Sequence, residues 1–405
     1  MTVFRPFAAL RYSETSSMNV LIAPPYDVLS ATDRMALEAK HPNNSVRIDF
    51  PHGAEDPEAY LRARFLLDSW ISHNVVSVDE TDSFSIYRMI ATDESGLTRQ
   101  TTGVIGGLGL EPPGTGDVLP HEETTSKDKA DRLNLIRATK INTSPIWGLS
   151  LSSGLGVLLE SFTEKYPMLA EATDEEGVVH QVWRIDVSED VRAIQSLAEQ
   201  TPVVIADGHH RFETGLAYLA ELAEPGGTAG AMGEATAIMA LLVELAEDQL
   251  VVRAIHRLVE FSAGETLETL IDDLAAFFTV ASIDSVTPAA VDEMAAGGYL
   301  TLVGPSASWT LTPRPGAFDD SVDLDSTRLR IALASVAPAA AVRYQHSVAS
   351  VVSQVTGGQA SCGILLRPAT VQQIRSVADS RTRMPAKTTF FWPKPRTGIT
   401  FRSVN

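Results

Sequence analysis

The sequence predicts a mixed α+β fold built around a strand, a tight turn and a helix. Segments with the pattern of strands alternate with segments that have the pattern of helices through the middle of the chain. Residues 201–206 form a short apolar run, which is typical of a strand buried on both faces. The chain has 405 residues and is 44% hydrophobic, so it can bury one large core or two to three smaller ones. Additional mixed subdomains are expected around the central strand and helix.

The central elements can be placed from local patterns. Residues 84–90 and 98–110 are predicted strands, joined by a turn whose Ser-Gly end suits a positive backbone φ. Residues 125–140 show helical spacing of apolar side chains and charge pairs four residues apart, and the Asn-Thr-Ser-Pro run that follows ends this helix. An Ala/Leu-rich helix at 212–223 comes directly after the apolar strand. The other elements expected here are strands at 146–151 and 178–185 and a helix at 188–199.

The later half is also mixed. Residues 237–245 and 250–258 are predicted to pair as strands. The remaining predicted elements are helices at 267–278, 288–296, 327–336 and 370–380, a hairpin at 299–303 and 308–311, and a strand at 362–366. Proline and glycine near 112–114 and 225–230 suggest boundaries that divide the chain into residues 1–112, 113–230 and 231–405. We expect these three regions to form one compact unit.

Charge and composition exclude several classes of protein. The net charge of −19 argues against duplex DNA or RNA as a partner, because nucleic acids need a basic surface to replace their counterions. No run approaches the roughly 18 apolar residues of a membrane helix, and residues 1–12 lack the pattern of a signal peptide, so a cytoplasmic protein is expected. The one cysteine, Cys362, lies in an apolar segment and is predicted to be a buried, inert thiol.

The turn between the apolar strand and the next helix carries the densest polar cluster, Asp207-Gly208-His209-His210-Arg211. The strand ends in a carboxylate, and the glycine frees the turn. The first turn of the helix then offers unpaired backbone N–H groups to an anion. Two histidines and an arginine add donors that match phosphate oxygens. The segment therefore predicts an anion site for a phosphorylated small molecule.

Two other interpretations of this turn stay open. Asp207 could cap the helix while His209 and Arg211 are solvated surface groups. Alternatively, His209 and Glu213 lie four residues apart and could be two ligands of a metal ion, although no third ligand is evident nearby. Five polar or flexible residues in a row exceed what capping requires, so a functional turn is favoured and no metal is assigned.

Two further clusters contain groups suited to catalysis or phosphate binding. His121 and Glu122 offer a general base and its orienting partner, with Lys129 and Arg132 close behind, although a solvated loop before a helix would have the same composition. Near the end of the chain, two lysines flank an aromatic strand-like run and could reach a phosphate or carboxylate, but such lysines are often solvated. These lysines are Lys387 and Lys394.

In this order, these clusters resemble the motifs of the domain-of-unknown-function 1015 family, and the resemblance runs nearly from end to end. Its elements are Arg5-Pro6-Phe7, Pro24-Pro25-Tyr26-Asp27-Val28, His121-Glu122-Glu123-Thr124 with Lys129-Ala130-Asp131-Arg132, Ser144-Pro145-Ile146, Ala206 to Arg211, Ile255-His256-Arg257, and Met384-Pro385 through Pro393-Lys394 to Gly398. One departure is Lys387-Thr388-Thr389, where a Lys-Ser-Thr run is expected.

The box from Asp207 to Arg211 also resembles that of the ParB/sulfiredoxin-like superfamily, which includes nucleotide-dependent kinases of free serine, CTP-binding proteins and a sulfinic-acid reductase. This likeness implies a related core fold, nucleotide phosphates at residues 208–211, and Glu122 as a base for a substrate hydroxyl. The expected catalytic residues are therefore His121, Glu122, Asp207 and His210. The expected nucleotide- or phosphate-binding residues are Lys129, Arg132, Gly208, His209, Arg211, Lys387 and Lys394.

The function that fits these expectations is phosphoryl transfer from a nucleotide to a hydroxylated metabolite such as serine, with ATP or ADP and Mg²⁺ as the expected cofactors. A P-loop kinase is disfavoured because the chain has no Gly-x-x-x-x-Gly-Lys-Ser/Thr run. Two alternatives use the same residues. One is a nucleotide-binding regulatory protein without catalysis, and the other is a hydrolase of phosphate esters or small amides.

Overall fold

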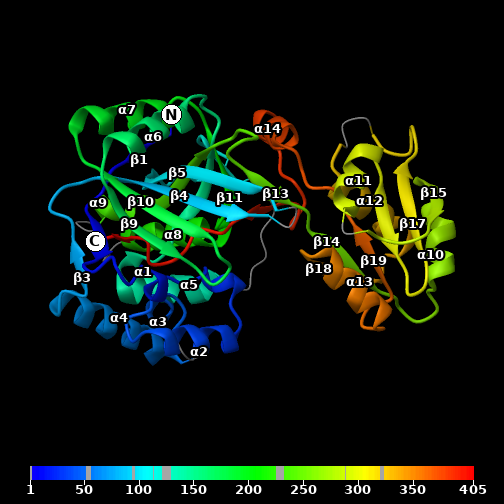
Figure 1. Ribbon diagram of the computed structural model, residues 1–405, viewed down its shortest axis with the longest axis horizontal. Helices are drawn as coiled ribbons and strands as arrows, with labels where there is room; N and C mark the ends of the chain where they lie inside the picture. Colours follow the sequence, from blue (N-terminus) through cyan, green and yellow to red (C-terminus); the bar gives the residue numbers. More distant parts are fainter. Residues whose placement is uncertain are drawn as a thin grey trace. The chain divides into compact units, whose positions relative to one another are not determined.

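The computed structural model describes residues 2–51, 56–93, 96–112, 114–120, 129–224, 232–287, 289–319 and 323–405. The chain divides into two compact units, each with its own core (Figure 1). The first unit comprises Met1–Val251 and Pro393–Asn405, and the second comprises Val252–Trp392. The last segment of the chain therefore returns to the unit in which the chain began.

The first unit contains helices and strands in alternation. Its helices are α1 (Met18–Leu21), α2 (Ala31–Lys40), α3 (Val46–Asp49), α4 (Pro57–Ser72), α5 (Lys129–Thr139), α6 (Leu155–Lys165), α7 (Ser188–Ala198), α8 (His209–Ala223) and α9 (Met232–Ala235), with a 3-10 helix η1 (Tyr26–Val28). Its strands are β1 (Phe4–Arg5), β2 (Ala9–Tyr12), β3 (Val76–Val78), β4 (Phe84–Thr92), β5 (Thr98–Gly109), β6 (Val118–Pro120), β7 (Ile141–Asn142), β8 (Ile146–Ser150), β9 (Met168–Thr173), β10 (Val179–Ile185), β11 (Val203–Asp207), β12 (Ala237–Glu244) and β21 (Phe401–Ser403).

The main sheet of this unit is mixed, with the strand order β6-β11-β8-β12-β5-β4-β10-β9 and with β1 added beside β5. Strand β11 runs parallel to β6, with Ile205 opposite Pro120, and antiparallel to β8, with Asp207 opposite Trp147. The carboxyl ends of β6 and β11 and the beginning of β8 therefore meet at one edge of the sheet. The polar turn after Asp207 begins at this edge.

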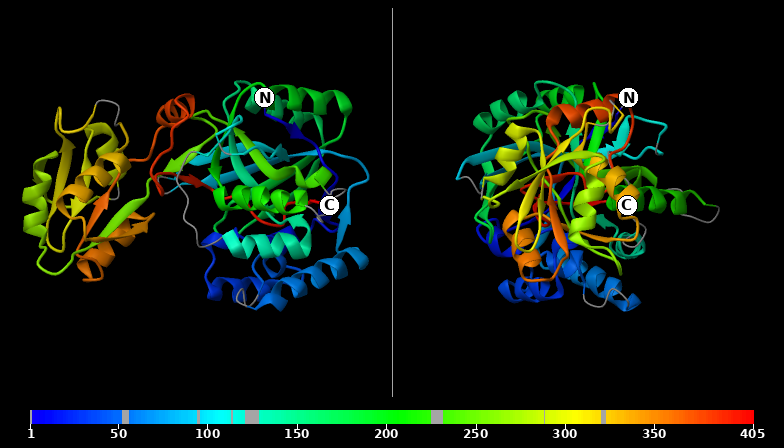
Figure 2. Two further views of the ribbon diagram at one scale, coloured as in Figure 1. Left: turned by 180° about the vertical axis from the view of Figure 1, so that it is seen from behind. Right: turned by 90° about the vertical axis from the view of Figure 1, so that its right-hand side faces the viewer.

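Helices cover the main sheet on both sides. Figure 1 shows α6 and α7 along one side of the sheet and α5 and α4 along the other, and Figure 2 shows the same layers from behind. Leu159 of α6, Ile194 of α7 and Phe212 of α8 share the buried core with the sheet. Farther out, Tyr218 of α8 packs with Ile136 of α5. A second, smaller sheet has the order β3-β2-β21-β7, so the end of the chain is one of its inner strands.

The second unit has a sheet of order β15-β17-β16-β19-β14-β18 between two helical layers. Its helices are α10 (Leu267–Leu274), α11 (Ala290–Gly297), α12 (Asp325–Val336), α13 (Val348–Thr356) and α14 (Val371–Asp379). Its strands are β14 (His256–Glu260), β15 (Phe278–Ile283), β16 (Leu300–Val303), β17 (Ser308–Pro313), β18 (Ala341–Gln345) and β19 (Cys362–Leu365). Strands β13 (Val251–Arg253) and β20 (Phe390–Trp392) lie where the chain passes from one unit to the other.

The structure confirms the mixed fold and corrects one strand pairing. The hairpin of β4 and β5 and that of β16 and β17 form as predicted. The expected pairing of residues 237–245 with 250–258 is wrong, because β12 pairs with β5 and β8 while β14 pairs with β18 and β19. Cys362 is buried as expected, and burial raises the pKa of its thiol to about 12. No helix in the described parts of the chain is long and apolar enough to cross a membrane.

Candidate functional site

The turn between β11 and α8 depends on Gly208. This residue is the N-cap of α8 with φ of 86°, a conformation that favours glycine, and no side-chain cap is present. A Cβ atom here would lie 3.0 Å from Cγ2 of Ile146 and 3.1 Å from the guanidinium of Arg211. The helix therefore begins at once after Gly208, which has no side chain with which to cap it.

Asp207 forms two ion pairs and does not cap the helix. Its Oδ1 lies 2.7 Å from Nζ of Lys394, and its Oδ2 lies 3.2 Å from Nη2 of Arg211. Burial alone would raise the pKa of the Asp207 carboxyl, but Lys394 and Arg211 outweigh it and hold the pKa at about 2. The capping interpretation of Asp207 is thereby excluded, and a lysine nearly two hundred residues away joins the turn.

Arg211 also faces the segment before β8. Its Nη1 donates to Oγ of Ser144 at 3.0 Å and to the backbone carbonyl of Pro145. Arg211 and Arg132 together line a small cavity of about 40 Å³, which Ser144 and Thr143 line as well. Two arginines and three hydroxyl-bearing residues thus line this small space, and most of its other lining residues are apolar.

Arg132 is buried and held on three sides. Its Nη1 donates to the backbone carbonyl of Asp49 at 2.7 Å and lies 3.3 Å from the carboxylate of the same residue. Asp131 pairs with the other guanidinium nitrogens. The Tyr26 ring lies 3.8 Å from the Arg132 guanidinium carbon, a close cation–π contact. The proline-rich motif near the N-terminus therefore meets α5 here.

Asp27 adds a second carboxylate near Asp207. Although solvent reaches Asp27, protein atoms around it partly desolvate the carboxyl and raise its pKa, and repulsion from Asp207 raises it further. Attraction to Arg211 and Lys394 opposes this rise. Two acidic groups with oppositely shifted pKa values therefore lie at this site, and such a pair is frequent at functional sites.

The segment after Lys394 contacts both the N-terminal motif and α3. Thr397 exchanges two backbone hydrogen bonds with Ala23, of 3.0 and 2.8 Å, and its hydroxyl donates to Asp49 at 3.3 Å. Arg396, which is buried, pairs with the buried carboxylate of Asp174. The end of the chain therefore fixes Lys394, the N-terminal motif and α3 in one place.

The structure brings together part of the predicted site. Asp207, Gly208, Arg211, Arg132 and Lys394 converge, and His209 and His210 begin α8 beside them. Pro120 ends β6 at this edge of the sheet, but the predicted His121 and Glu122 lie outside the described residues. Lys129 is the first residue of α5. Lys387 belongs to the second unit.

The residues that sequence analysis missed are Tyr26, Asp27 and Asp49. Tyr26 and Asp27 stand in the Pro-Pro-Tyr-Asp-Val motif, so a signal was present although no role was assigned to it. No sequence motif marks Asp49 as part of the site, because only the fold shows that it is buried against Arg132 and Thr143. Among the described residues, there is no group of three His, Cys, Asp or Glu side chains that could hold a metal ion.

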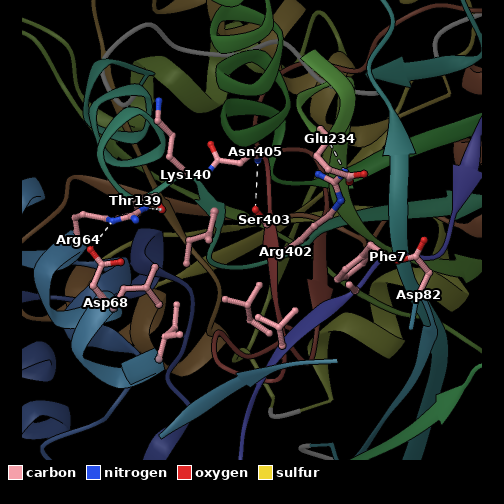
Figure 3. A pocket seen from close by; sticks show the side chains of 16 residues that line it. Phe7, Arg64, Asp68, Asp82, Thr139, Lys140, Glu234, Arg402, Ser403 and Asn405 are labelled. Carbon is pink, nitrogen blue, oxygen red and sulfur yellow. Dashed lines mark hydrogen bonds and ion pairs between the residues drawn. The ribbon is translucent and has the colours of Figure 1, made fainter. Parts of the chain in front are cut away.

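A larger cavity of about 400 Å³ lies elsewhere in the first unit, between α4, β21 and the end of α5 (Figure 3). Two ion pairs lie within its lining. Arg402 pairs with Glu234, and Arg64 pairs with Asp68, as the dashed lines in Figure 3 show.

Comparison with known proteins gives a family and distant structural similarities. The family model described as "Protein of unknown function (DUF1015)" matches residues 4–329. No curated protein matches. The chain is similar to a conserved hypothetical protein from Pyrococcus furiosus, with 11% identity, a TM-score of 0.37, and coverage of 69% of this chain and 90% of that one.

Two other solved structures are also similar. A free serine kinase in complex with AMP has 15% identity and a TM-score of 0.36 over 75% of this chain and 89% of that one. A C-terminally truncated SbnI from Staphylococcus aureus has 12% identity and a TM-score of 0.39 over 72% and 85%. The family model, in contrast, spans most of the chain, and the protein belongs to the DUF1015 family of proteins of unknown function.

Proposed function

We propose that the protein is a small-molecule enzyme that binds nucleotide phosphates at the turn between β11 and α8 and transfers a phosphoryl group to a hydroxylated metabolite such as serine. The observation that carries this proposal is the convergence of Arg132, Arg211 and Lys394, from three distant segments, beside the start of α8. Backbone N–H groups and guanidinium groups are the donors that phosphate oxygens prefer. The resemblance of the Asp-Gly-His-His-Arg box to serine kinases supplies the choice of acceptor.

The charge balance of the site limits how a nucleotide can bind. Arg211 and Lys394 both pair with Asp207, and Arg132 pairs with Asp49. These cations therefore bring little surplus positive charge to a di- or triphosphate. Backbone N–H groups, the two histidines at the start of α8 and a divalent cation would supply the remaining stabilisation.

A bound Mg²⁺ ion would supply the positive charge that the paired cations of the site lack. In phosphoryl-transfer sites this ion is held by one or two carboxylates together with the substrate's phosphates and water. Asp27 suits that role better than Asp207, because both oxygens of Asp207 already accept hydrogen bonds from Arg211 and Lys394. When bound, Mg²⁺ would neutralise charge on the phosphate oxygens.

The remaining roles follow the resemblance and are part of the proposal. The substrate hydroxyl oxygen attacks the terminal phosphorus, the bond from that phosphorus to the leaving phosphate oxygen breaks, and Glu122 accepts the hydroxyl proton. His121 would orient Glu122, and His210 would donate a hydrogen bond to the transferred group. Lys129 is proposed as a further phosphate contact, and Lys387, which belongs to the second unit, is given no role at this turn.

The test is a turnover assay on the purified protein with ATP, ADP or CTP, Mg²⁺ and a panel of amino acids. Nucleotide consumption and phosphorylated product are measured by chromatography and mass spectrometry. We expect turnover that depends on the acceptor and is abolished in His210→Ala. Arg211→Ala should raise the nucleotide Kd about tenfold or more, since a hydrogen bond to a charged group contributes roughly 1.5–3 kcal/mol. The matched control is Arg137→Ala, because Arg137 pairs with Glu221 on the surface.

Other outcomes distinguish the alternatives. Tight nucleotide binding without turnover on any acceptor would favour a regulatory protein. Release of phosphate or ammonia from esters or amides without a nucleotide would favour a hydrolase. If folded Arg211→Ala binds nucleotide and inorganic phosphate as the wild type does, the turn is not an anion site.

A further inference from the structure

A second cavity of about 240 Å³ lies within the second unit, between α12, β14 and β18. Side chains alternate along β14, so Arg257 faces the same side as Val259, which packs with α12 in the buried core. Tyr344 of β18 stands opposite Arg257 in the sheet register. The segment at Pro385 and Ala386 closes another wall. This cavity uses no residue of the turn after β11.

The charged residues of its lining are both cations. They are Arg257, which is 7% exposed, and Arg330, which is exposed on α12, and the residues that line the cavity include no acidic side chain. The Arg257 guanidinium lies 4.7 Å above the Tyr344 ring. It also donates to the backbone carbonyls of Ile255 and Lys387, which orient it. In a chain of net charge −19, a cavity whose charged lining residues are both cations is a local exception.

The rest of the lining is mainly apolar. Leu329, Leu333, Ala334 and Ala337 of α12 and its end form one wall. Tyr344, which is 48% exposed, offers an aromatic face at the rim. The volume is about 240 Å³, slightly below the roughly 300–1,000 Å³ of common ligand sites, and it has room for a single ring or a short branched chain.

We propose that this cavity binds a small amphipathic anion, in which a carboxylate or phosphate contacts Arg257 and Arg330 and an apolar body lies against α12. Burial of the apolar body supplies affinity, and the two guanidinium groups select the charge. Because the proposal concerns the second unit alone, it does not rest on the function proposed for the turn after β11.

The test measures binding of four single-ring probes to the full-length protein by ligand-observed NMR and calorimetry. Phenylacetate and phenyl phosphate carry the two candidate anionic groups, benzyl alcohol is neutral, and phenethylamine is cationic. We expect one or both anions to bind with a Kd below about 1 mM, and the neutral and cationic probes to bind at least tenfold more weakly. The better anion identifies the head group.

Variants place the probe in the cavity. Arg330→Gln changes an exposed side chain and should raise the Kd of the anion about threefold to tenfold without unfolding the unit. Ala334→Phe should block the apolar wall and abolish binding. The matched controls are Arg343→Gln and Ala339→Phe, which alter exposed residues of the same unit outside the lining and should bind as the wild type does.

Three results would overturn the proposal. No binding of either anion up to about 10 mM would show that the cavity is not a site of useful affinity. Equal binding of benzyl alcohol would show an apolar cavity without charge selection. Binding that survives both Arg330→Gln and Ala334→Phe would place the anion elsewhere.

Discussion

Replacing Lys394 with glutamine tests the ion pair that joins the end of the chain to the turn after β11. Lys394 lies 2.7 Å from Asp207 and is the largest of the attractive influences on its pKa, ahead of Arg211 and His209. The pKa of Asp207 is about 2, against an ordinary value of 3.8. A difference of this size corresponds to about 2 kcal/mol of folding stability at neutral pH. Lys394→Gln should therefore cost about 1–2 kcal/mol at pH 7.

The pH dependence of this cost has a definite sign. The pKa of Asp207 is lower in the folded protein than in the unfolded chain, so its stabilisation is fully present above the unfolded value and is lost as pH falls through the folded value. The deficit of Lys394→Gln should thus be nearly the same at pH 7 and pH 5, and fall to roughly half at about pH 3.

The assay is urea unfolding followed by tryptophan fluorescence at pH 7, 5 and 3. The control is Lys40→Gln, because Lys40 pairs with Glu175 at 3.3 Å on the surface and such pairs contribute roughly 0–1 kcal/mol. A Lys394→Gln protein as stable as the wild type at pH 7, or a deficit that stays constant down to pH 3, would refute the ion-pair account of Asp207.

Three further substitutions test the frame of the site. Gly208→Ala places a Cβ at positive φ against two side chains and should lower stability by about 1–2 kcal/mol in thermal unfolding; Gly154→Ala, also at positive φ but facing open space, should cost less. Arg132→Met leaves a buried carboxylate of α3 without its cation, and urea unfolding should show a loss of about 3–5 kcal/mol, whereas a loss below 1 kcal/mol would contradict the buried pair. Asp174→Asn removes the carboxylate that pairs with a buried arginine of the last segment, and calorimetry should show a similar loss of stability. Relative to the wild type, hydrogen exchange should become faster in residues 393–400 and change less in α10.

Local patterns predicted the strand and helix around the turn well. The apolar run predicted β11, and the alternation of residues 84–110 predicted the hairpin of β4 and β5. Helix α8 begins at His209, three residues before the predicted start, because the apolar spacing that signals the helix begins only at Phe212. Gly208 allows the helix to begin without a capping side chain. A helix start of this kind cannot be predicted from the spacing of apolar residues.

Nonlocal partners could not be predicted in the same way. Residues 237–245 and 250–258 are close in sequence and both apolar, which favours a hairpin, yet β12 pairs with the distant strands β5 and β8. Asp49 is a comparable case in the site, since its partners Arg132, Thr143 and Thr397 come from three remote segments. The spacing of residues along the chain cannot predict contacts between such distant positions. Only the resemblance to the DUF1015 family indicated that the distant polar clusters belong to one site.

The order of the chain makes the site dependent on its last segment. The first unit is interrupted after Val251, and Lys394 and Thr397 arrive only after the second unit has been traversed. Such an insertion costs little entropy, because the cost of closing a loop grows only slowly with its length. The returning segment supplies the cation for Asp207 and the backbone partner of Ala23, so one stretch of chain both completes the proposed anion site and anchors the N-terminal motif. Substitutions in the returning segment should therefore abolish anion binding and also increase the mobility of residues 23–28. Substitutions in the turn alone should abolish anion binding and leave residues 23–28 in place.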